Sequence, residues 1–356
     1  MAEAVKTGRT AVVLFNLGGP DSPQAVRPFL FNLFNDRAII DLPNPLRFFL
    51  AKLISGRREK TAQAIYDHLG GRSPLLDLTK EQAAALEGAL ADLGEVKVFV
   101  AMRYWHPFSV ETAADVKRFS PDRVVLLPLY PQFSGTTTGS SFKDWDQAAR
   151  KVGLTVSGPR LCCYPQLSEL CQAHAALIAE HLEEARQYGK FRVLFSAHGL
   201  PKKIIAKGDP YQWQVERCVE GVVSALGDRS LDWSICYQSR VGPLEWIGPS
   251  TDEEIRRAGA EGVALVVVPI AFVSEHSETL VEIGIEYRHL AESVGVPGFV
   301  RVPALNAADV FIRGLAGMVR ESADQSGVCP AGRKGTRICP KEFGRCPADL
   351  PAETAV

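Results

Sequence analysis

The chain of 356 residues has no apolar run long enough to cross a membrane. Its longest stretches fall short of the roughly 18 consecutive apolar residues that a spanning helix needs, and the first ten residues lack the apolar core of a signal peptide. We therefore expect a cytoplasmic protein. In that reducing compartment the eight cysteines should be thiols, so a cluster of them favours metal binding over disulfides.

An excess of charge is absent too. The 40 basic and 41 acidic residues leave a net charge of -1, and no basic stripe interleaved with aromatic residues is present, so we expect no nucleic-acid partner. The turn Gly18-Gly19-Pro20 lacks the G-x-G-x-x-G spacing of a dinucleotide-binding loop, so a nicotinamide or flavin site is poorly supported. The 46% of hydrophobic residues is typical of a globular protein, here of about two domains.

Apolar, β-branched runs alternate with amphipathic stretches of helical length. The runs span 10–16, 96–102, 122–130, 191–197, 232–237 and 262–270, and the helical stretches span 79–93, 166–187, 210–226 and 306–320. Repetition of strand and helix predicts a parallel α/β fold. Because the repeats are too many for one small sheet, we expect two doubly wound domains that face each other.

The run 262–270 leads into a segment where Glu278, Glu282 and Glu286 recur at every fourth position. Like charges at this spacing destabilise an isolated helix by about 0.2–0.5 kcal/mol per pair. A solvated outer face is one interpretation, since most acidic stripes are such faces. The nearby His276 favours the other interpretation, a ligand site at the carboxyl edge of a sheet.

A second histidine, His198, follows the run 191–197. If both runs belong to one parallel sheet, His198 emerges on the same edge as His276 and Glu278. An imidazole opposed to a carboxylate binds a divalent metal or moves protons near neutral pH. A lone loop histidine is more often a surface residue, so the interpretation depends on this convergence.

Residues 45–60 combine six large apolar side chains with five basic ones. Such a stretch lies on a membrane surface or closes over an apolar ligand. The alternative is a core helix whose basic side chains reach out to solvent.

Eight motifs resemble those of the ferrochelatases and occur in the same order. They are Asn16-Leu-Gly-Gly-Pro20, Gly70-Gly-Arg-Ser-Pro74, Arg103-Tyr104, Tyr130-Pro-Gln-Phe-Ser134, Thr137-Thr-Gly-Ser-Ser141, Phe195-Ser-Ala-His-Gly-Leu-Pro201, the run 238–249 and the run 269–280. Each motif alone is modest, whereas eight in register identify the chain as a member of this family.

The resemblance implies two Rossmann-like domains that enclose a porphyrin cleft, and insertion of Fe²⁺ into protoporphyrin IX with release of two protons. We accordingly expect an N-terminal domain at 8–175 with a membrane-facing lip at 45–60. A second domain at 176–305 would carry His198 and the acidic helix, and a C-terminal helix and cysteine-bearing tail at 306–356 would pack back on the first domain.

The resemblance also assigns the catalytic and metal-binding residues. His198 matches the active-site histidine, and Glu278 with His276 matches the facing acid. The acidic row, proposed for metal entry or proton exit, adds Glu275, Glu282 and Glu286. We expect a π-bulge in this helix, because an ordinary α-helix would rotate the row. Whether His198 accepts a proton or binds iron stays open.

A flat, apolar dianion needs apolar walls and anchors for two propionates. By resemblance, the propionate contacts are Arg58 and Ser73. The remaining porphyrin-binding residues are Leu17, Tyr66, Arg103, Tyr104, Phe133, Trp246 and Phe272.

Cys329, Cys339 and Cys346 lie in a polar tail that cannot bury a core of its own, and three thiolates there suggest a metal cross-link. Some ferrochelatases hold a [2Fe-2S] cluster with three such cysteines and a fourth from the body, but Ala173 stands at the position of that fourth ligand. The nearby candidates are Cys162, Cys163 and Cys171, of which we choose Cys163. A zinc site or free thiols are the alternative.

The expected partners are protoporphyrin IX, ferrous iron and the cytoplasmic membrane surface. Two alternatives stay open, a related chelatase for coproporphyrin or another divalent metal, and a module that binds porphyrin or haem without turnover. The family includes monomers and dimers, so the resemblance is compatible with a homodimer.

Overall fold

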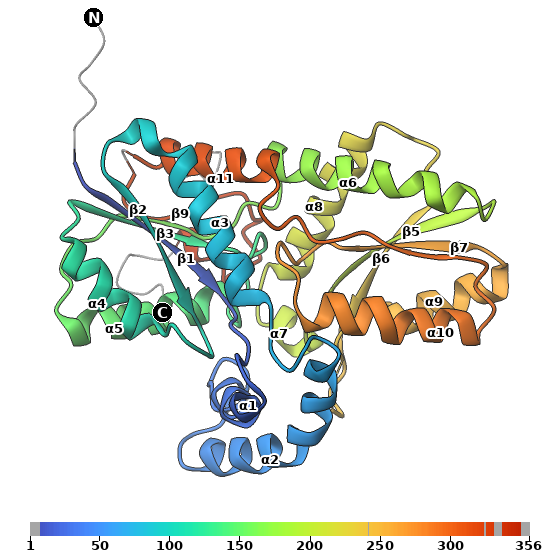
Figure 1. Cartoon of the computed structure of the whole chain (residues 1–356), viewed down its shortest axis with the longest axis horizontal. Helices are drawn as coiled ribbons and strands as arrows, with labels where there is room; N and C mark the ends of the chain where they lie inside the picture. The colour runs from blue at the N-terminus through green and yellow to red at the C-terminus, as the bar shows by residue number, and fades with distance from the viewer. Residues whose placement is uncertain (1–7, 241, 324, 331–336, 350–356) are drawn as a thin grey trace, which may run out of the picture. The chain divides into compact units, whose positions relative to one another are not determined.

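The structure, a computed structural model, describes residues 8–240, 242–323, 325–330 and 337–349. The chain forms two compact units (Figure 1). Unit 1 contains the chain up to Cys163 together with Leu315–Ile338 and the segment from Pro347, and unit 2 contains Tyr164–Gly314 and Cys339–Cys346. Each unit has its own parallel sheet flanked by helices, so the predicted α/β fold with two doubly wound parts is confirmed.

The sheet of unit 1 has the strand order β2-β1-β3-β4-β9. Its strands are β1 (Thr10–Asn16), β2 (Val96–Met102), β3 (Arg123–Pro128), β4 (Pro159–Leu161) and β9 (Gly327–Cys329). All seven residues of β1 are buried, as a strand covered on both faces requires. In Figure 1, α3 (Leu75–Ala89) covers one face, and α4 (Ser109–Phe119) and α5 (Thr138–Val152) cover the other.

Two further helices of unit 1 follow β1. After the 3₁₀ turn η1 (Pro23–Ala25), α1 (Val26–Phe34) packs against the long helix α2 (Leu46–Asp67). A second 3₁₀ turn, η2 (Ala91–Leu93), follows α3. Helix α2 buries few of its side chains, and Phe49 at its start is 65% exposed. This exposure excludes the interpretation of residues 45–60 as a core helix.

The sheet of unit 2 has the strand order β6-β5-β7-β8. Its strands are β5 (Phe191–His198), β6 (Trp233–Gln238), β7 (Ala264–Pro269) and β8 (Phe299–Arg301). Helices α6 (Ser168–Arg186) and α8 (Tyr211–Leu226) lie on one face, and α9 (Thr251–Glu261), the π-helix η3 (Glu278–Tyr287) and α10 (Arg288–Ser293) lie on the other (Figure 1). The short helix α7 (Lys202–Ala206) follows β5.

The division of the chain differs from the expected domains in two places. The expected boundary at 175/176 lies inside α6, and this whole helix belongs to unit 2. The return to unit 1 falls inside α11 (Asp309–Glu321), at Leu315, and further along the chain β9 pairs with β4 of the same unit. Cys339–Cys346 instead belong to unit 2, and the 3₁₀ turn η4 (Pro347–Asp349) belongs to unit 1. Residues 331–336 and 350–356 of the expected tail lie outside the described residues.

In the described part of the chain, none of the helices combines the length and the hydropathy that spanning a bilayer requires.

A buried histidine lies on α6. His174 is fully buried, and neither ring nitrogen has a hydrogen-bond partner among the described residues. Burial disfavours the charged imidazolium and lowers the pKa of His174 to about 4, compared with about 6.5 in an unfolded chain. The folded protein therefore takes up this proton at lower pH than the unfolded chain does.

We predict that His174 makes unit 2 sensitive to acid. Its neutral ring contributes stability in full above pH 6.5, and this contribution falls as the pH drops towards 4, by about 3 kcal/mol in all. In urea denaturation across this range, His174→Leu should lose less stability than the wild type. His289→Leu, which alters an exposed histidine of α10, is the control and should follow the wild type. Equal acid dependence in His174→Leu and wild type would contradict the prediction.

Candidate functional site

The carboxyl ends of three strands meet at one edge of the sheet in unit 2. His198, the last residue of β5, lies opposite Gln238, the last residue of β6. On its other side β5 pairs with β7, with Ser196 opposite Pro269. The loop after β7 leads to His276 and to Glu278 at the start of η3. The register therefore brings the residues predicted from separate strands to one place.

Two predicted imidazoles converge on one oxygen of the predicted carboxylate, Glu278. His198 Nε2 lies 3.9 Å from Glu278 Oε2, and His276 Nε2 lies 3.8 Å from the same oxygen. The His198 and Glu278 side chains are partly exposed, whereas His276 is almost completely buried. The site thus presents its central carboxylate and one imidazole to solvent.

The hydrogen bond of His198 assigns the tautomer of its neutral ring. Nδ1 lies 2.6 Å from the carbonyl oxygen of Gly199, and because a carbonyl only accepts, Nδ1 must carry the hydrogen. The neutral ring therefore directs the lone pair of Nε2 towards Glu278. Two acceptors that face each other at 3.9 Å leave room for a proton or a cation, since metal ligand bonds to nitrogen and oxygen are each about 2 Å long.

Glu278 stays ionised over the physiological pH range. Burial opposes the charged form, but the charge of His198, a hydrogen bond and the charge of His276, and a hydrogen bond from Ser239 outweigh it. Together they lower the pKa of Glu278 to about 2. The carboxylate is therefore a weak base and a good partner for a cation.

Glu282, one turn further along η3, has the opposite tendency. Burial and the charge of Glu278 raise its pKa, against hydrogen bonds from Ser239 and Gln238. Ser239 donates to Glu282 from its backbone N (2.8 Å) and its Oγ (2.6 Å), and Gln238 Nε2 donates at 2.9 Å. Tyr287 Oη donates at 3.1 Å. Two neighbouring carboxylates thus have pKa values displaced in opposite directions, a pattern that separates a charged partner from a proton acceptor.

Ser239 was not among the predicted site residues. Its Oγ lies within hydrogen-bond distance of both Glu278 Oε2 (3.3 Å) and Glu282 Oε2, and its φ of 62° is unusual for a residue other than glycine. Backbone strain of this kind persists where the surroundings impose it. Its place just after β6 is the signal that could have found it, because Gln238 at the end of β6 lies opposite His198 at the end of β5.

The acidic row itself follows a π-helix. The whole segment Glu278–Tyr287 is π-helical, so the predicted π-bulge is confirmed and is longer than one turn. Glu275 precedes it, and both its oxygens are occupied: Oε1 accepts from Arg301 Nη1 (2.7 Å) and Ala304 N (3.1 Å), and Oε2 accepts from the Thr279 hydroxyl. Glu275 therefore fixes the start of the helix, whereas Glu286 is exposed at its far end.

Two predicted porphyrin-binding residues of unit 2 lie beside these histidines. The rings of Phe272 and His276 have centroids 4.6 Å apart. Trp246 bridges to Pro201, and a Cβ placed on Gly199 would lie 3.2 Å from its indole ring. The Trp246 Nε1 is buried and has no partner among the described residues. Both aromatic side chains thus adjoin the loops that carry the imidazoles.

Unit 1 gathers three other predicted porphyrin-binding residues. Leu17, Tyr66 and Tyr104 belong to one apolar cluster that packs α1 and the end of α2 against the loops after β1 and β2. Phe133 is buried in a different cluster, beneath α5.

The predicted anchors of unit 1 differ in their availability. Arg103 is occupied inside the fold, since Nη2 donates to Asp36 (2.9 Å), Nε donates to Ser140 (2.8 Å) and Nη1 lies 3.6 Å from Asp144. Tyr104 Oη donates to the same Asp36 carboxylate at 2.8 Å. Asp36 was not predicted, and it ties the segment between α1 and α2 to the loop after β2.

Ser73 and Arg58 contrast in the same way. Ser73 is buried, with its backbone N bonded to Pro20 O at 2.8 Å, and a Cβ on Gly19 would lie 2.5 Å from its Oγ. Arg58 on α2 is exposed, with its guanidinium 5.8 Å from the centre of the Phe34 ring. Of the two predicted propionate contacts, Arg58 is the accessible cation.

Comparison with known proteins decides the family. A model of the ferrochelatase family matches residues 9–323. Ferrochelatases from Phenylobacterium zucineum and Caulobacter vibrioides are each 54% identical to this chain, over 95% and 96% of it and 97% and 98% of their own lengths. This chain belongs to the ferrochelatase family. The sirohydrochlorin chelatase SirB from Bacillus subtilis, solved with cobalt, shares the fold at 13% identity, with a TM-score of 0.50 over 89% of this chain and 96% of its own.

The cysteines considered for a cluster in this ferrochelatase family member are all buried. In unit 1, Cys162 N donates to Cys329 O at 2.9 Å, and the sulfur atoms of Cys162 and Cys163 are 3.6 Å apart. Burial, reinforced by the charge of Cys163, raises the pKa of Cys329 to about 11. In unit 2, Gln214 Nε2 donates to Cys339 Sγ at 3.1 Å.

No group of three or more His, Cys, Asp or Glu side chains is arranged to hold a metal ion within the residues that the structure describes. The two histidines and Glu278 are near one another without closing around a point. The four cysteines are divided equally, with Cys163 and Cys329 in unit 1 and Cys339 and Cys346 in unit 2.

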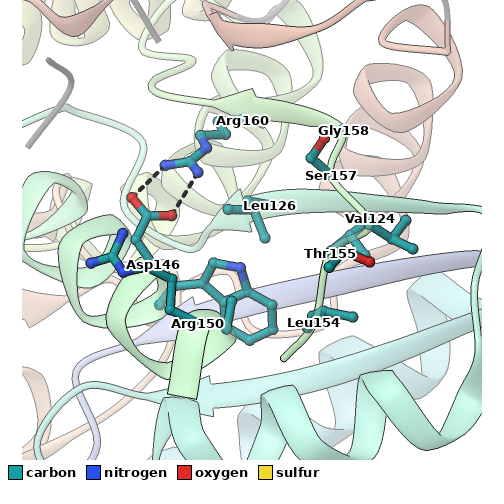
Figure 2. Close-up of a pocket in the computed structure, with 12 residues that line it drawn as sticks. Val124, Leu126, Asp146, Arg150, Leu154, Thr155, Ser157, Gly158 and Arg160 are labelled. Atoms are coloured by element: carbon teal, nitrogen blue, oxygen red, sulfur yellow. Dashed lines mark hydrogen bonds and ion pairs between the residues drawn. The ribbon is translucent and has the colours of Figure 1, made fainter. Parts of the chain in front are cut away.

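A cavity of about 180 Å³ lies elsewhere in unit 1, between β3, the end of α5 and the loop to β4 (Figure 2). Figure 2 shows the Arg160 guanidinium paired with the Asp146 carboxylate at its rim, at 2.6 and 2.9 Å. None of the predicted site residues is among its described lining residues. We therefore assign the cavity no role.

The strained serine allows a test that separates backbone strain from hydrogen bonding. We expect Ser239→Ala to be less stable than the wild type by about 1–3 kcal/mol, because buried carboxylates lose a donor. Ser239→Gly, which removes the same hydroxyl but relieves the positive φ, should recover about 1 kcal/mol of that loss. Urea denaturation at neutral pH measures both.

Ser120 is the matched control, since its φ is 51° and its hydroxyl contacts only the Lys117 carbonyl, at 3.3 Å, among the described residues. Ser120→Ala should cost much less than Ser239→Ala, while Ser120→Gly should recover a similar amount. Equal losses for the two alanine variants would show that the carboxylates do not depend on Ser239.

Proposed function

We propose that this chain inserts Fe²⁺ into protoporphyrin IX to give protohaem, with His198, His276 and Glu278 as its catalytic residues. The observation that carries the assignment is the approach of the His198 and His276 Nε2 atoms to one Glu278 oxygen, at 3.9 and 3.8 Å. Membership of the ferrochelatase family supports the reaction.

The reaction exchanges one metal ion for two pyrrole protons. The ionised Glu278 and, in the neutral ring of His198, the lone pair of Nε2 suit the approach of ferrous iron and the removal of its water. Glu282, whose pKa is raised, is the better proton acceptor of the two carboxylates. We assign proton exit to Glu282 and Glu286, which also serve as the metal route, and give Glu275 the task of fixing the helix start.

The porphyrin contacts in this proposal come from the family resemblance. Arg58 and Ser73 contact the propionates. The other porphyrin-binding residues come from both Rossmann-like domains and are Leu17, Tyr66, Arg103, Tyr104, Phe133, Trp246 and Phe272. Arg103 acts through its bonds to Asp36, since its guanidinium is already occupied.

The segment 45–60 is proposed as a membrane-facing lip. Four large apolar side chains there are exposed, among them Phe49 at 65% and Leu46 at 60%, and the basic residues of the segment lie on α2. Such a surface binds anionic headgroups while its apolar residues enter the interface. The protein would then work in the cytoplasm at the membrane surface, where an apolar porphyrin is held, which favours protoporphyrin over coproporphyrin. A homodimer stays a prediction.

We further propose a [2Fe-2S] cluster with Cys163, Cys329, Cys339 and Cys346 as ligands. Four buried thiols fit the donor chemistry of such a cluster, and the N–H of Gln214 on Cys339 Sγ resembles the hydrogen bonds that tune cluster sulfurs. The cluster would supply an electron-accepting centre and a cross-link. Iron and sulfide analysis of protein purified without oxygen tests this, and iron-free protein would contradict it.

We predict that His198→Ala and Glu278→Gln each lower metal insertion by roughly 100-fold or more, since each removes a group that meets the metal or the protons. Porphyrin binding, followed by fluorescence quenching, should persist in both. The assay is anaerobic and compares ferrous iron with protoporphyrin and with coproporphyrin.

His289→Ala, on the exposed face of α10, is the control and should retain full activity. Undiminished turnover by His198→Ala would overturn the catalytic assignment and leave a porphyrin-binding module as the alternative. Faster turnover of coproporphyrin would shift the substrate to that porphyrin.

For the lip, we expect Phe48→Ser combined with Phe49→Ser to weaken binding to vesicles of phosphatidylglycerol and phosphatidylcholine by roughly tenfold or more, because each phenylalanine contributes about 1.5–3 kcal/mol when fully buried. Sedimentation with vesicles measures the effect. Leu244→Ser, which alters an exposed apolar residue of unit 2, should bind as the wild type does. If the wild type, the double phenylalanine variant and Leu244→Ser all bind the vesicles equally, the lip does not face the membrane.

A further inference from the structure

A short segment of the C-terminal region, Cys339–Cys346, packs on unit 2 as a strap. Its Arg345 N donates to Gly208 O at 3.1 Å. Gly208 has a φ of 89°, and a Cβ at this position would lie 2.9 Å from Gly344 N. The close approach and the positive φ together require glycine at 208. The strap therefore rests directly on the backbone just before α8.

Two further contacts join the strap to the first turn of α8. Gln214 Nε2 donates to Cys339 Sγ at 3.1 Å, and Gln214 is fully buried. The rings of Trp213 and Phe343 have centroids 6.0 Å apart. Residues near both ends of the strap therefore contact the turn that starts α8.

The same turn makes a direct hydrogen bond to β5, the strand that ends at His198. Tyr211, the first residue of α8, donates from its Oη to the carbonyl oxygen of His198 at 3.0 Å. Burial raises the pKa of Tyr211 well above its usual range, so the phenol remains a donor at physiological pH. The backbone N of Tyr211 in turn donates to Asp209 Oδ1 at 3.1 Å.

This bond matters because the backbone at His198 orients its imidazole. His198 Nδ1 donates to the next carbonyl, that of Gly199, at 2.6 Å, and Gly199 N donates to Gln238 O at 2.8 Å. A shift of the His198 carbonyl would therefore move Nε2 relative to Glu278, which lies 3.9 Å away.

We propose that the strap positions His198 for metal insertion through the turn Gly208–Gln214, with Tyr211 as the positioning residue. The proposal rests on the proposed function of His198. Displacement of the strap changes the turnover number, because the imidazole loses its alignment, and leaves porphyrin affinity unchanged. In this way a segment of the C-terminal region helps to orient a catalytic residue of unit 2.

The test compares full-length variants in the anaerobic ferrous iron assay with protoporphyrin. Gly208→Ala forces the strap away and should lower kcat roughly tenfold with an unchanged KM for porphyrin, since small misplacements of reacting groups cost about that much or more. Gly227→Ala is the matched control: Gly227 ends the same helix with a φ of 72°, and a Cβ placed there would meet no atom of the described residues within 4 Å. It should retain wild-type kcat.

A second variant, Phe343→Ala, disturbs the strap from its own side and should also lower kcat if Gly208→Ala does not fold. Tyr211→Phe removes only the hydroxyl. In the double variant, Gly208→Ala added to Tyr211→Phe should lower kcat no further than Tyr211→Phe alone, because the hydrogen bond to His198 is already lost.

Three results would overturn the inference: equal kcat in Gly208→Ala and Gly227→Ala, a raised KM with unchanged kcat, or additive losses in the double variant. An inactive wild-type protein would instead refute the proposed function itself.

Discussion

The candidate site depends on one carboxylate, Glu278, held at the carboxyl edge of a parallel sheet within reach of two imidazoles. This position follows from strand register. With His198 opposite Gln238 across β5 and β6, and with β7 next to β5, the loops that follow all three strands must share one edge. A slip of one residue in any strand would turn these side chains to the opposite face.

Buried like charges would ordinarily destabilise such an edge. The structure meets this cost with hydrogen bonds: Glu282 accepts from Ser239, Gln238 and Tyr287, and Glu275 accepts from Arg301. Charge, rather than these bonds, separates the pKa values of the two central carboxylates. The two histidines lower the pKa of Glu278, whereas burial and the charge of Glu278 raise the pKa of Glu282.

The two units carry different kinds of surface. Unit 1 exposes apolar side chains at the start of α2, where few residues are buried, and it keeps Arg103 in internal ion pairs. Unit 2 exposes charged and polar groups at the ends of its strands.

The sequence by itself determined the α/β class, the positions of the main strands and helices, and the family. Apolar runs such as 262–270 and amphipathic stretches such as 210–226 are local signals, and they agree with β7 and α8 to within a few residues. Even the departure from α-helical geometry near Glu278 was expected from the spacing of the glutamates together with the resemblance, and the π-helix at 278–287 agrees with it.

Only the tertiary structure decided which groups are already occupied. From the sequence, Arg103 and Glu275 were expected to be available for ligands. In the structure each is paired with a residue distant in the chain, Arg103 with Asp36 and Glu275 with Arg301. Ser239 lies beside Glu278 and Glu282 with a positive φ, and the strap packs on unit 2 where it approaches Gly208 closely. Contacts between residues far apart in the chain depend on packing, which no local pattern of residues encodes.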